Sequence, residues 1–251
     1  MHIILAVYTA LLGLLLGSFY NVVGLRVPAG ESIIHPPSSC PSCCTRLRSR
    51  DLVPVFSYLF SRGKCRHCGA GVSVLYPLGE LATSLLFLWM VLELGFTWTA
   101  LNGLLLVSLS IIITISDLKY MLIPNKVLLF FLPLLAVVTL LAEPEQWLSH
   151  LLGLLLGGAL IGLVVVLSRG RMGMGDLKLL ALLGWVLGAP QTLLAFMLAC
   201  ALGSLVGGVL LGLKIITRSQ PVPFGPWLAA GALVSYVYGS QIISGYLSLL
   251  G

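Results

Sequence analysis

The sequence has 251 residues, of which 59% are hydrophobic and only 9% are charged, and its mean hydropathy is +1.08. Apolar runs such as LLGLLLGGALIGLVVVL carry far more apolar surface than one soluble core can bury, which excludes a soluble globular domain and predicts a polytopic membrane protein. The net charge of +6 is spread over short segments without a basic stripe interleaved with aromatic residues, so nucleic-acid binding is not expected.

Apolar windows long enough to cross about 30 Å of hydrocarbon predict eight membrane helices. In chain order they cover residues 3–25, 76–94, 98–116, 125–142, 147–167, 177–188, 191–214 and 226–249, the sixth being unusually short. The first has no basic segment before it and no A-x-A-like end, so we expect it to be retained as a span and not cleaved as a signal peptide. The predicted fold class is all-α.

The basic residues indicate how these helices are oriented. The fourteen fall at or next to every second connection: Arg26, Arg46, Arg48, Arg50, Arg62, Lys64, Arg66, Lys119, Lys126, Arg169, Arg171, Lys178, Lys214 and Arg218. By the positive-inside rule those connections are cytoplasmic, and the acidic turns with Glu93, Glu143 and Glu145 are outside. Both termini are then predicted to lie outside.

One large polar insertion, residues 26–75, interrupts the hydrophobic pattern on the cytoplasmic side. It contains two C-x-x-C pairs, Cys40 with Cys43 and Cys65 with Cys68. Two such pairs folded onto each other supply the four thiolates of a tetrahedral zinc site. Disulfides or free thiols are the alternative, but a reducing cytoplasm disfavours stable disulfides, and the insertion has few apolar residues to hold it together without a metal.

Three other residues bear on this zinc hypothesis. Cys44 follows the first pair where a turn favours glycine, as Gly69 follows the second, and His67 lies inside the second pair. Either Cys44 or His67 is an alternative ligand. Cys200 stands alone in an apolar span, and we interpret it as a small packed hydrophobic residue.

Two aspartates at the membrane edge are the candidates for chemistry. Asp117 ends the third predicted span and Asp176 begins the sixth, both at the predicted cytoplasmic side. Two neighbouring carboxyl groups in a poorly solvated place share a proton, so one can activate water while the other protonates a substrate carbonyl. Gly173 and Gly175 would let the backbone approach a peptide closely. The alternative is that Asp176 only stabilises a helix N-terminus and Asp117 is ordinary interfacial charge.

With these motifs the chain resembles the bacterial type IV prepilin peptidases, the membrane aspartic proteases of the GxGD class that also N-methylate the new N-terminus. The resemblance covers nearly the whole chain. It is carried by GSFYNVVGLRVP, the paired C-x-x-C motifs, GKCRHCGAGVSVLYPLGEL, SDLKYMLIPN, GMGDLKLLALLG and VPFGPWLAAG. It implies that Asp117 and Asp176 are catalytic, and that the substrates are prepilins and pilin-like proteins with short basic leaders, cut at the cytoplasmic face of the bacterial inner membrane.

The same resemblance implies methyl transfer from S-adenosylmethionine, with the zinc-containing insertion and its flanking helices as the implicated region. The sequence has no G-x-G-x-x-G loop after a strand, so a Rossmann methyltransferase domain is not expected. Glu80 at the edge of the second span could hold an amine, and Asn21 and Arg26 could serve polar recognition from the first. Ordinary polar contacts and membrane anchoring explain these three residues equally well.

We therefore expect three regions: a first transmembrane helix in residues 1–25, the four-cysteine insertion in residues 26–75, and a helical domain with the peptidase site in residues 76–251. A protease of the signal-peptide-peptidase or presenilin type is disfavoured, because Ser116 precedes Asp117 where those proteins have Tyr, and no Pro-Ala-Leu motif follows. Archaeal preflagellin peptidases are not expected to carry the cysteine insertion. A non-enzymatic scaffold or transporter with a structural zinc module is the alternative from another class.

Overall fold

The structure is a computed structural model that describes residues 2–168, 173–217, 220 and 222–250. It contains eight long helices: α1 (His2–Arg26), α3 (Leu75–Leu94), α4 (Trp98–Tyr120), α5 (Asn125–Ala142), α6 (Trp147–Leu167), α7 (Met174–Leu187), α8 (Ala189–Gly212) and α9 (Gly225–Leu250). Every helix end lies within four residues of its predicted position. Three basic residues used to orient the spans, Arg169, Arg171 and Arg218, lie outside the described residues.

The long helices are those of a multi-pass membrane protein. Within the described ranges, six of them are long and apolar enough to cross a membrane: α1, α3, α4, α5, α6 and α8. At 14 residues α7 is short, as predicted, and covers only about 21 Å at 1.5 Å per residue. The 26 residues of α9 are long enough, but this helix, which contains several serines, glycines and tyrosines, is not among those six. The all-α membrane class is confirmed.

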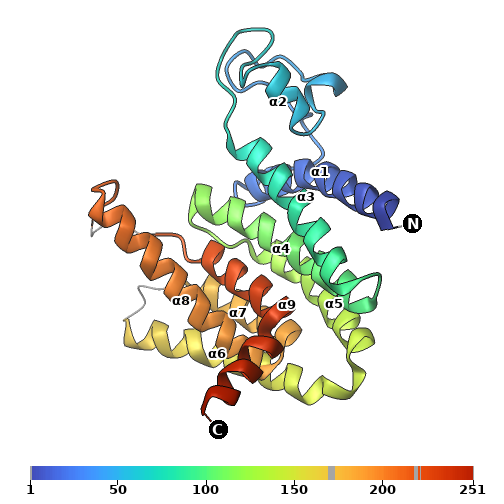
Figure 1. Ribbon diagram of the computed structural model, residues 1–251. Helices are drawn as coiled ribbons and strands as arrows, with labels where there is room; N and C mark the ends of the chain where they lie inside the picture. The colour runs from blue at the N-terminus through green and yellow to red at the C-terminus, as the bar shows by residue number, and fades with distance from the viewer. Residues whose placement is uncertain (1, 169–172, 218–219, 221, 251) are drawn as a thin grey trace.

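Helix α4 is the centre of the bundle. It packs against α1, α3, α5 and α9, and its interior face is almost entirely buried. Figure 1 shows α4 between the α1–α3 pair and the group formed by α6, α7, α8 and α9. Both ends of this helix are therefore in contact with elements from distant parts of the sequence.

Close backbone contacts hold the helix pairs together. On α1, an added Cβ at Gly13 would lie 2.6 Å from the Cα of Ser84 on α3. On α6, an added Cβ at Gly157 would collide with the carbonyl oxygen of Leu180 on α7. Glycine is needed at such positions because membrane helices associate through close packing of small residues and not through the hydrophobic effect.

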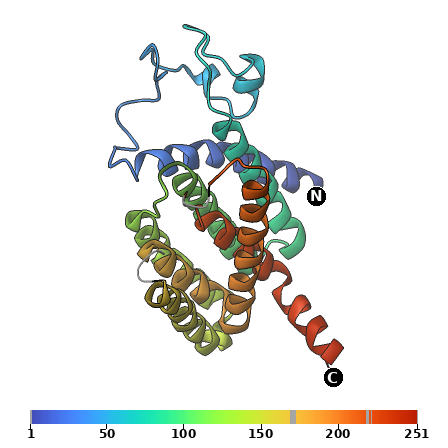
Figure 2. The same cartoon turned by 90° about the vertical axis from the view of Figure 1, so that its left-hand side faces the viewer.

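The insertion forms a small module beyond the ends of α1 and α3, as both views show (Figure 1, Figure 2). Its regular elements are a 3-10 turn, η1 (Ser49–Asp51), and one short helix, α2 (Phe56–Phe60). A second 3-10 turn, η2 (Pro144–Gln146), joins α5 to α6. With so little regular structure, the insertion depends on specific side-chain contacts for its shape.

Candidate active site and metal centre

Asp117 lies in the last turn of α4 and is buried, with 6% of its surface exposed. Its Oδ2 accepts a hydrogen bond of 2.8 Å from the backbone N–H of Gly225, the first residue of α9. Within the part of the chain that the structure describes, no side chain or backbone group donates to Oδ1. One oxygen of this carboxyl is thus held by a helix N-terminus.

The chain reverses immediately after Asp117. The N–H of Met121 donates to the Asp117 carbonyl at 2.8 Å, and Met121 takes the left-handed conformation with φ 51°. The hydroxyl of Ser116 donates to the carbonyl of Leu122 and ties the turn back to the helix. These contacts fix the direction in which the Asp117 side chain leaves α4.

Asp176 lies half-buried in the first turn of α7. It is close enough to Asp117 for the two carboxylates to interact electrostatically. The two aspartates are 59 positions apart in the sequence (176 less 117) and come from different helices. The fold thus brings the two carboxyl groups near each other from different helices, and their action as a catalytic pair stays a prediction.

The start of α7 is held against the start of α5. An added Cβ at Gly175 would lie 2.9 Å from the Cβ of Ile123, and Lys178 Nζ donates to Asn125 Oδ1 at 2.9 Å. The close backbone approach at Gly175 is thus to a residue of this chain, whereas an approach to a bound peptide stays a prediction. Because Asn125 begins α5 and Asp117 lies in the last turn of α4, this contact ties the helix of Asp176 to the segment that follows Asp117.

Gly225 is the residue of this site to which sequence reasoning assigned no role. An added Cβ here would lie 2.8 Å from Asp117 Oδ2. The available signal was a glycine before Pro226 at the start of an apolar run, a pattern typical of a helix start. Nothing in that pattern pairs it with an aspartate 108 positions earlier.

The thiols of Cys40, Cys43, Cys65 and Cys68 gather in one place, with their sulfur atoms all within 4.8 Å of one another. Cys40 Sγ and Cys68 Sγ are 3.7 Å apart. Four sulfurs at 2.3 Å from a central Zn²⁺ in tetrahedral geometry are separated by about 3.8 Å, so this donor set fits zinc. All six cysteines of the chain are free, and the disulfide alternative is not seen.

Each half of this cluster has the same local geometry. The N–H of Cys44 donates to the Cys40 carbonyl and that of Gly69 to the Cys65 carbonyl, both at 2.9 Å. Cys44 and Gly69 both have a positive φ, of 54° and 74°. The two turns present backbone N–H groups to the sulfurs. The N–H of Cys43 is the main cause that lowers the pKa of Cys40, and the N–H of Cys68 is the main cause that lowers the pKa of Cys65. A lowered pKa favours the thiolate that binds metal.

The alternative ligands lie outside this cluster. The thiol of Cys44 is exposed. Cys44 occupies the turn position that Gly69 occupies in the other half of the cluster. Among the described residues the grouped ligands are the four cysteines, without His67. Cys200 lies on α8, far along the chain from the insertion and partly buried.

The three residues considered for methyl transfer connect the insertion to the membrane helices. Glu80 on α3 is buried, and its Oε2 accepts a hydrogen bond of 2.7 Å from the N–H of Val55, just before α2. Asn21 on α1 donates to the Tyr76 carbonyl at 3.0 Å, and its buried Oδ1 has no donor among the described residues. Arg26 donates to two backbone carbonyls of the insertion. A structural role accounts for most of these contacts, and the unpaired oxygen of Asn21 is the exception.

The sequence matches two descriptions of one protein family. Residues 11–94 match the Bacterial Peptidase A24 N-terminal domain, and residues 104–208 match the Type IV leader peptidase family. The first match contains the four clustered cysteines, and the second contains both aspartates. Each match therefore contains one of the two candidate sites, the cysteine cluster in the first and the aspartates in the second.

The chain is also similar to named bacterial proteins over almost its full length. It is 39% identical to the prepilin leader peptidase/N-methyltransferase of Bacillus subtilis, over 94% of this chain and 96% of the relative. Identity is 33% to the proteins of the same name from Pseudomonas aeruginosa and Aeromonas hydrophila, over 97% and 95% of this chain and 93% and 92% of the relatives. No solved structure matches the chain.

Proposed function

Because the chain belongs to the type IV leader peptidase family, and is therefore a membrane protease, we propose that it removes the leader peptides of prepilins and pilin-like proteins. The observation that carries the proposal is that the fold brings two carboxyl groups, one from α4 and one from α7, near enough to interact electrostatically, one of them buried. A buried acidic residue in a membrane protein is costly and is usually functional.

In the proposed mechanism Asp117 and Asp176 share one proton. The ionised carboxylate takes a proton from water, whose oxygen attacks the scissile carbonyl carbon, while the protonated carboxyl gives its proton to the carbonyl oxygen. The tetrahedral intermediate then loses its C–N bond as the proton passes to the departing amine. The pair titrates as a unit, so neither role is assigned to one residue. The N–H of Gly225 holds Asp117 Oδ2 and so orients its carboxyl for this step.

The second proposed activity is N-methylation of the new N-terminal residue with S-adenosylmethionine as donor. The insertion of residues 26–75 and the helices next to it are the proposed region, and zinc held by the four cysteines would stabilise its fold. Glu80 has the charge to hold an amine, Asn21 carries a buried oxygen that can accept a hydrogen bond, and Arg26 is the proposed polar contact.

The proposed organisation follows from these activities. Residues 1–25 form the first membrane helix, residues 26–75 the module associated with methyl transfer, and residues 76–251 the peptidase domain. We place the protein in the bacterial inner membrane, with the aspartates and the insertion at the cytoplasmic face and both termini outside. The partners are then pilin-like substrates and the lipid bilayer, and nucleic acid is not among them.

The test is mass spectrometry of a purified pilin-like precursor after incubation with this protein in detergent, with and without S-adenosylmethionine. We expect a loss of mass equal to the leader, and one additional methyl group only when S-adenosylmethionine is present. Asp117→Asn and Asp176→Asn should each slow cleavage by about 10³-fold or more, because the shared proton is lost.

Glu145→Gln is the matched control, because Glu145 is an exposed carboxylate in the turn between α5 and α6. This variant should cleave like the wild type. An active Asp176→Asn protein would contradict the aspartate mechanism. Failure of the wild type to cleave several pilin-like precursors would favour the non-enzymatic scaffold or transporter.

A further inference from the structure

The insertion exposes a group of large apolar side chains on and just before α2. This group, here named the α2 surface, consists of Leu52, Val53, Phe56, Leu59 and Phe60, whose exposed fractions run from 43% to 79%. The N–H of Ser57 donates to the Val53 carbonyl at 3.0 Å, so Val53 adjoins the first turn of α2. Single exposed apolar residues are ordinary, but a group of neighbours marks a surface that contacts a protein or a membrane.

The apolar residues of α2 lie on its outer side. Phe56, Leu59 and Phe60 follow the i, i+3, i+4 spacing that places side chains on one face of a helix. Tyr58, by contrast, is turned into the insertion, where an added Cβ at Gly63 would lie 2.8 Å from its hydroxyl oxygen. A helix on a soluble module exposes its polar face, whereas α2 exposes its apolar one.

Helix α2 begins beside the end of a membrane span. Residues Leu75–Leu94, which form α3, are long and apolar enough to cross a membrane. Glu80 lies in the second turn of α3 and accepts the hydrogen bond of 2.7 Å from the N–H of Val55, the residue directly before α2. Both views show α2 in the module beyond the ends of α1 and α3 (Figure 1, Figure 2). The α2 surface is therefore within reach of the lipid headgroups.

The insertion is also strongly basic. Residues 26–75 hold seven Lys and Arg against two Asp and Glu, a net charge of +5 out of +6 for the whole chain. One of the two acidic side chains, Asp51, is paired with Arg66 at 3.4 Å. Exposed basic residues precede and follow the α2 surface in the sequence: Arg48, Arg50, Arg62 and Lys64. A basic segment next to a membrane helix is attracted to anionic lipids.

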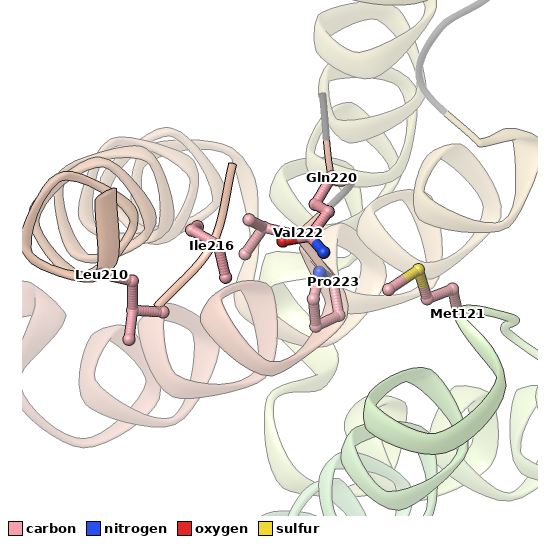
Figure 3. Close-up of a pocket in the computed structure, with 6 residues that line it drawn as sticks. All are labelled: Met121, Leu210, Ile216, Gln220, Val222 and Pro223. Atoms are coloured by element: carbon pink, nitrogen blue, oxygen red, sulfur yellow. The ribbon is translucent and has the colours of Figure 1, made fainter. Parts of the chain in front are cut away.

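The cavity of the insertion has the same chemistry. Its volume is about 490 Å³, and Arg46, Arg48 and His67 are among its lining residues. Ser49, which begins η1, lines it too, so it adjoins the segment that leads into α2. A cavity of about 320 Å³ between the turn after α4 and the segment before α9 is apolar by comparison, with Met121 in its lining (Figure 3). The lining of the insertion's cavity suits an anionic group such as a phosphate.

We propose that the α2 surface anchors the insertion on the bilayer next to α3, with its apolar side chains in the headgroup region and the neighbouring basic side chains on the phosphates of anionic lipids. Apolar side chains combined with cations are what interfacial helices use to bind a membrane surface. The charge disfavours two other occupants, because a precursor with a basic leader and a second copy of this basic module would both be repelled. The anchor requires neither of the two proposed activities.

The experiment is photocrosslinking of the full-length protein in nanodiscs of phosphatidylcholine mixed with phosphatidylglycerol. The photoreactive residue p-benzoylphenylalanine takes the place of Phe60, and intact mass spectrometry identifies what it attaches to. We expect adducts of one protein with one lipid, in which phosphatidylglycerol is enriched about threefold or more over its share of the bilayer. This enrichment should disappear in about 1 M salt, where charges are screened within about 3 Å.

The same photoreactive residue in place of Phe130 is the control for simple lipid contact. Phe130 lies on α5, within a membrane span, and is 64% exposed. Its adducts should contain the two lipids in the proportions of the bilayer, at low and at high salt.

Two sets of variants separate the contributions of charge and of apolar contact. Arg62→Glu combined with Lys64→Glu should abolish the enrichment at position 60, whereas Lys214→Glu, an exposed basic residue outside the insertion, should keep it. Leu59→Ser should lower the yield of lipid adducts at position 60 about threefold or more. Ile34→Ser is its matched control, because Ile34 is 72% exposed in the insertion but outside the α2 surface. An unchanged Tm in detergent shows that each variant is folded.

Three results would each overturn the anchor. Adducts with the mass of two chains would assign the α2 surface to a second copy, and adducts formed only when a precursor is added would assign it to the substrate. Lipid adducts at position 60 that show no enrichment of phosphatidylglycerol at low salt, or no adducts at all, would remove the anionic bilayer as its partner.

Discussion

The carboxyl of Asp117 is buried at the end of a helix whose next three residues are exposed. Moving a carboxylate out of water is costly unless it gains a partner. The partner here is a backbone N–H at the start of α9, where the positive end of the helix dipole also favours negative charge. The position of the Asp117 carboxyl therefore depends on one backbone N–H, that of Gly225, a residue without a side chain.

Gly225→Ala tests this arrangement at the residue scale. A Cβ at position 225 would lie 2.8 Å from Asp117 Oδ2, so the helix start or the carboxyl must shift. We expect kcat for precursor cleavage to fall by about 10²-fold with little change in KM, because a displacement of about 1 Å in catalytic geometry costs that much. Steady-state kinetics in detergent provide the measurement.

Gly245→Ala on the same helix is the control, because an added Cβ there meets open space. Its kinetics should match those of the wild type. Equal kcat values for the two variants would show that the contact between Gly225 and Asp117 does not position the carboxyl.

At the scale of elements, the insertion is built from two nearly identical turns. Each carries a C-x-x-C pair, and short antiparallel bridges, Ser39 with Arg46 and Lys64 with Gly71, flank them. The only described helix between the turns is α2, with 5 residues, too short to be stable alone. The cluster of four thiols brings the two halves into contact, with Cys40 Sγ 3.7 Å from Cys68 Sγ.

Cys40→Ser should remove bound zinc and lower the yield of protein or its methylation activity before leader cleavage is affected. The reason is that zinc binding supplies folding free energy to the module, whereas the aspartates lie on α4 and α7. Elemental analysis of zinc per chain, combined with the mass assay, provides the measurement. We expect one zinc in the wild type and none in the variant.

Cys44→Ser serves as the comparison, because its exposed thiol lies next to the cluster without joining it. This variant should keep its zinc. Loss of peptidase activity in a well-folded, metal-free Cys40→Ser protein would contradict the order of effects.

The α6–α7 pair is the element that carries Asp176. An added methyl group at Gly157 would collide with the Leu180 carbonyl, whereas at Gly158 the nearest atom is the Ala181 Cβ at 3.8 Å. We expect Gly157→Ala to destabilise the protein by about 1–3 kcal/mol through overpacking. Gly158→Ala should be neutral or stabilising, since alanine favours a helix over glycine by about 1 kcal/mol.

Thermal unfolding of both variants in the same detergent measures this difference. The Tm of Gly157→Ala should fall below that of Gly158→Ala, and precursor cleavage should weaken with it because Asp176 moves. Identical Tm values would mean that the backbone contact between α6 and α7 adds nothing to stability.

At the scale of the whole molecule, α4 joins the pair formed by α1 and α3 to the group formed by α5 to α9. Its buried face contacts the α1–α3 pair, beyond which the insertion lies, and its last turn carries Asp117 (Figure 1). Both proposed activities would then act on a substrate that approaches the same end of the bundle.

Labelling with a membrane-impermeant maleimide tests the orientation. The exposed Cys44 thiol should react only after the membrane is permeabilised, because the basic insertion is expected on the cytoplasmic side. In a Cys44→Ser background, Glu145→Cys should react in intact cells, since Glu145 lies in an exposed turn at the other end of α5. The reverse pattern would invert the proposed topology.

The sequence by itself determined the helices of this protein and the two cysteine pairs that form its cluster. Helix positions follow from apolar windows of fixed length, and the C-x-x-C spacing brings two thiols together within one turn, so both depend on local information. The short α7 was predicted for the same reason. The segment GLLLG occurs at residues 13–17 and again at 153–157, and the structure places the glycines of both copies at close helix contacts.

Only the tertiary structure decided which groups meet across the bundle. The contact of Gly225 with Asp117, that of Val55 with Glu80 and the cavity next to Met121 each join segments from 25 to 108 positions apart. Hydrophobic periodicity shows that a helix is present but not which helix packs beside it, because lipid-facing and helix-facing positions are equally apolar in a membrane. The partners of the buried polar groups are fixed by the packing of the helices around α4.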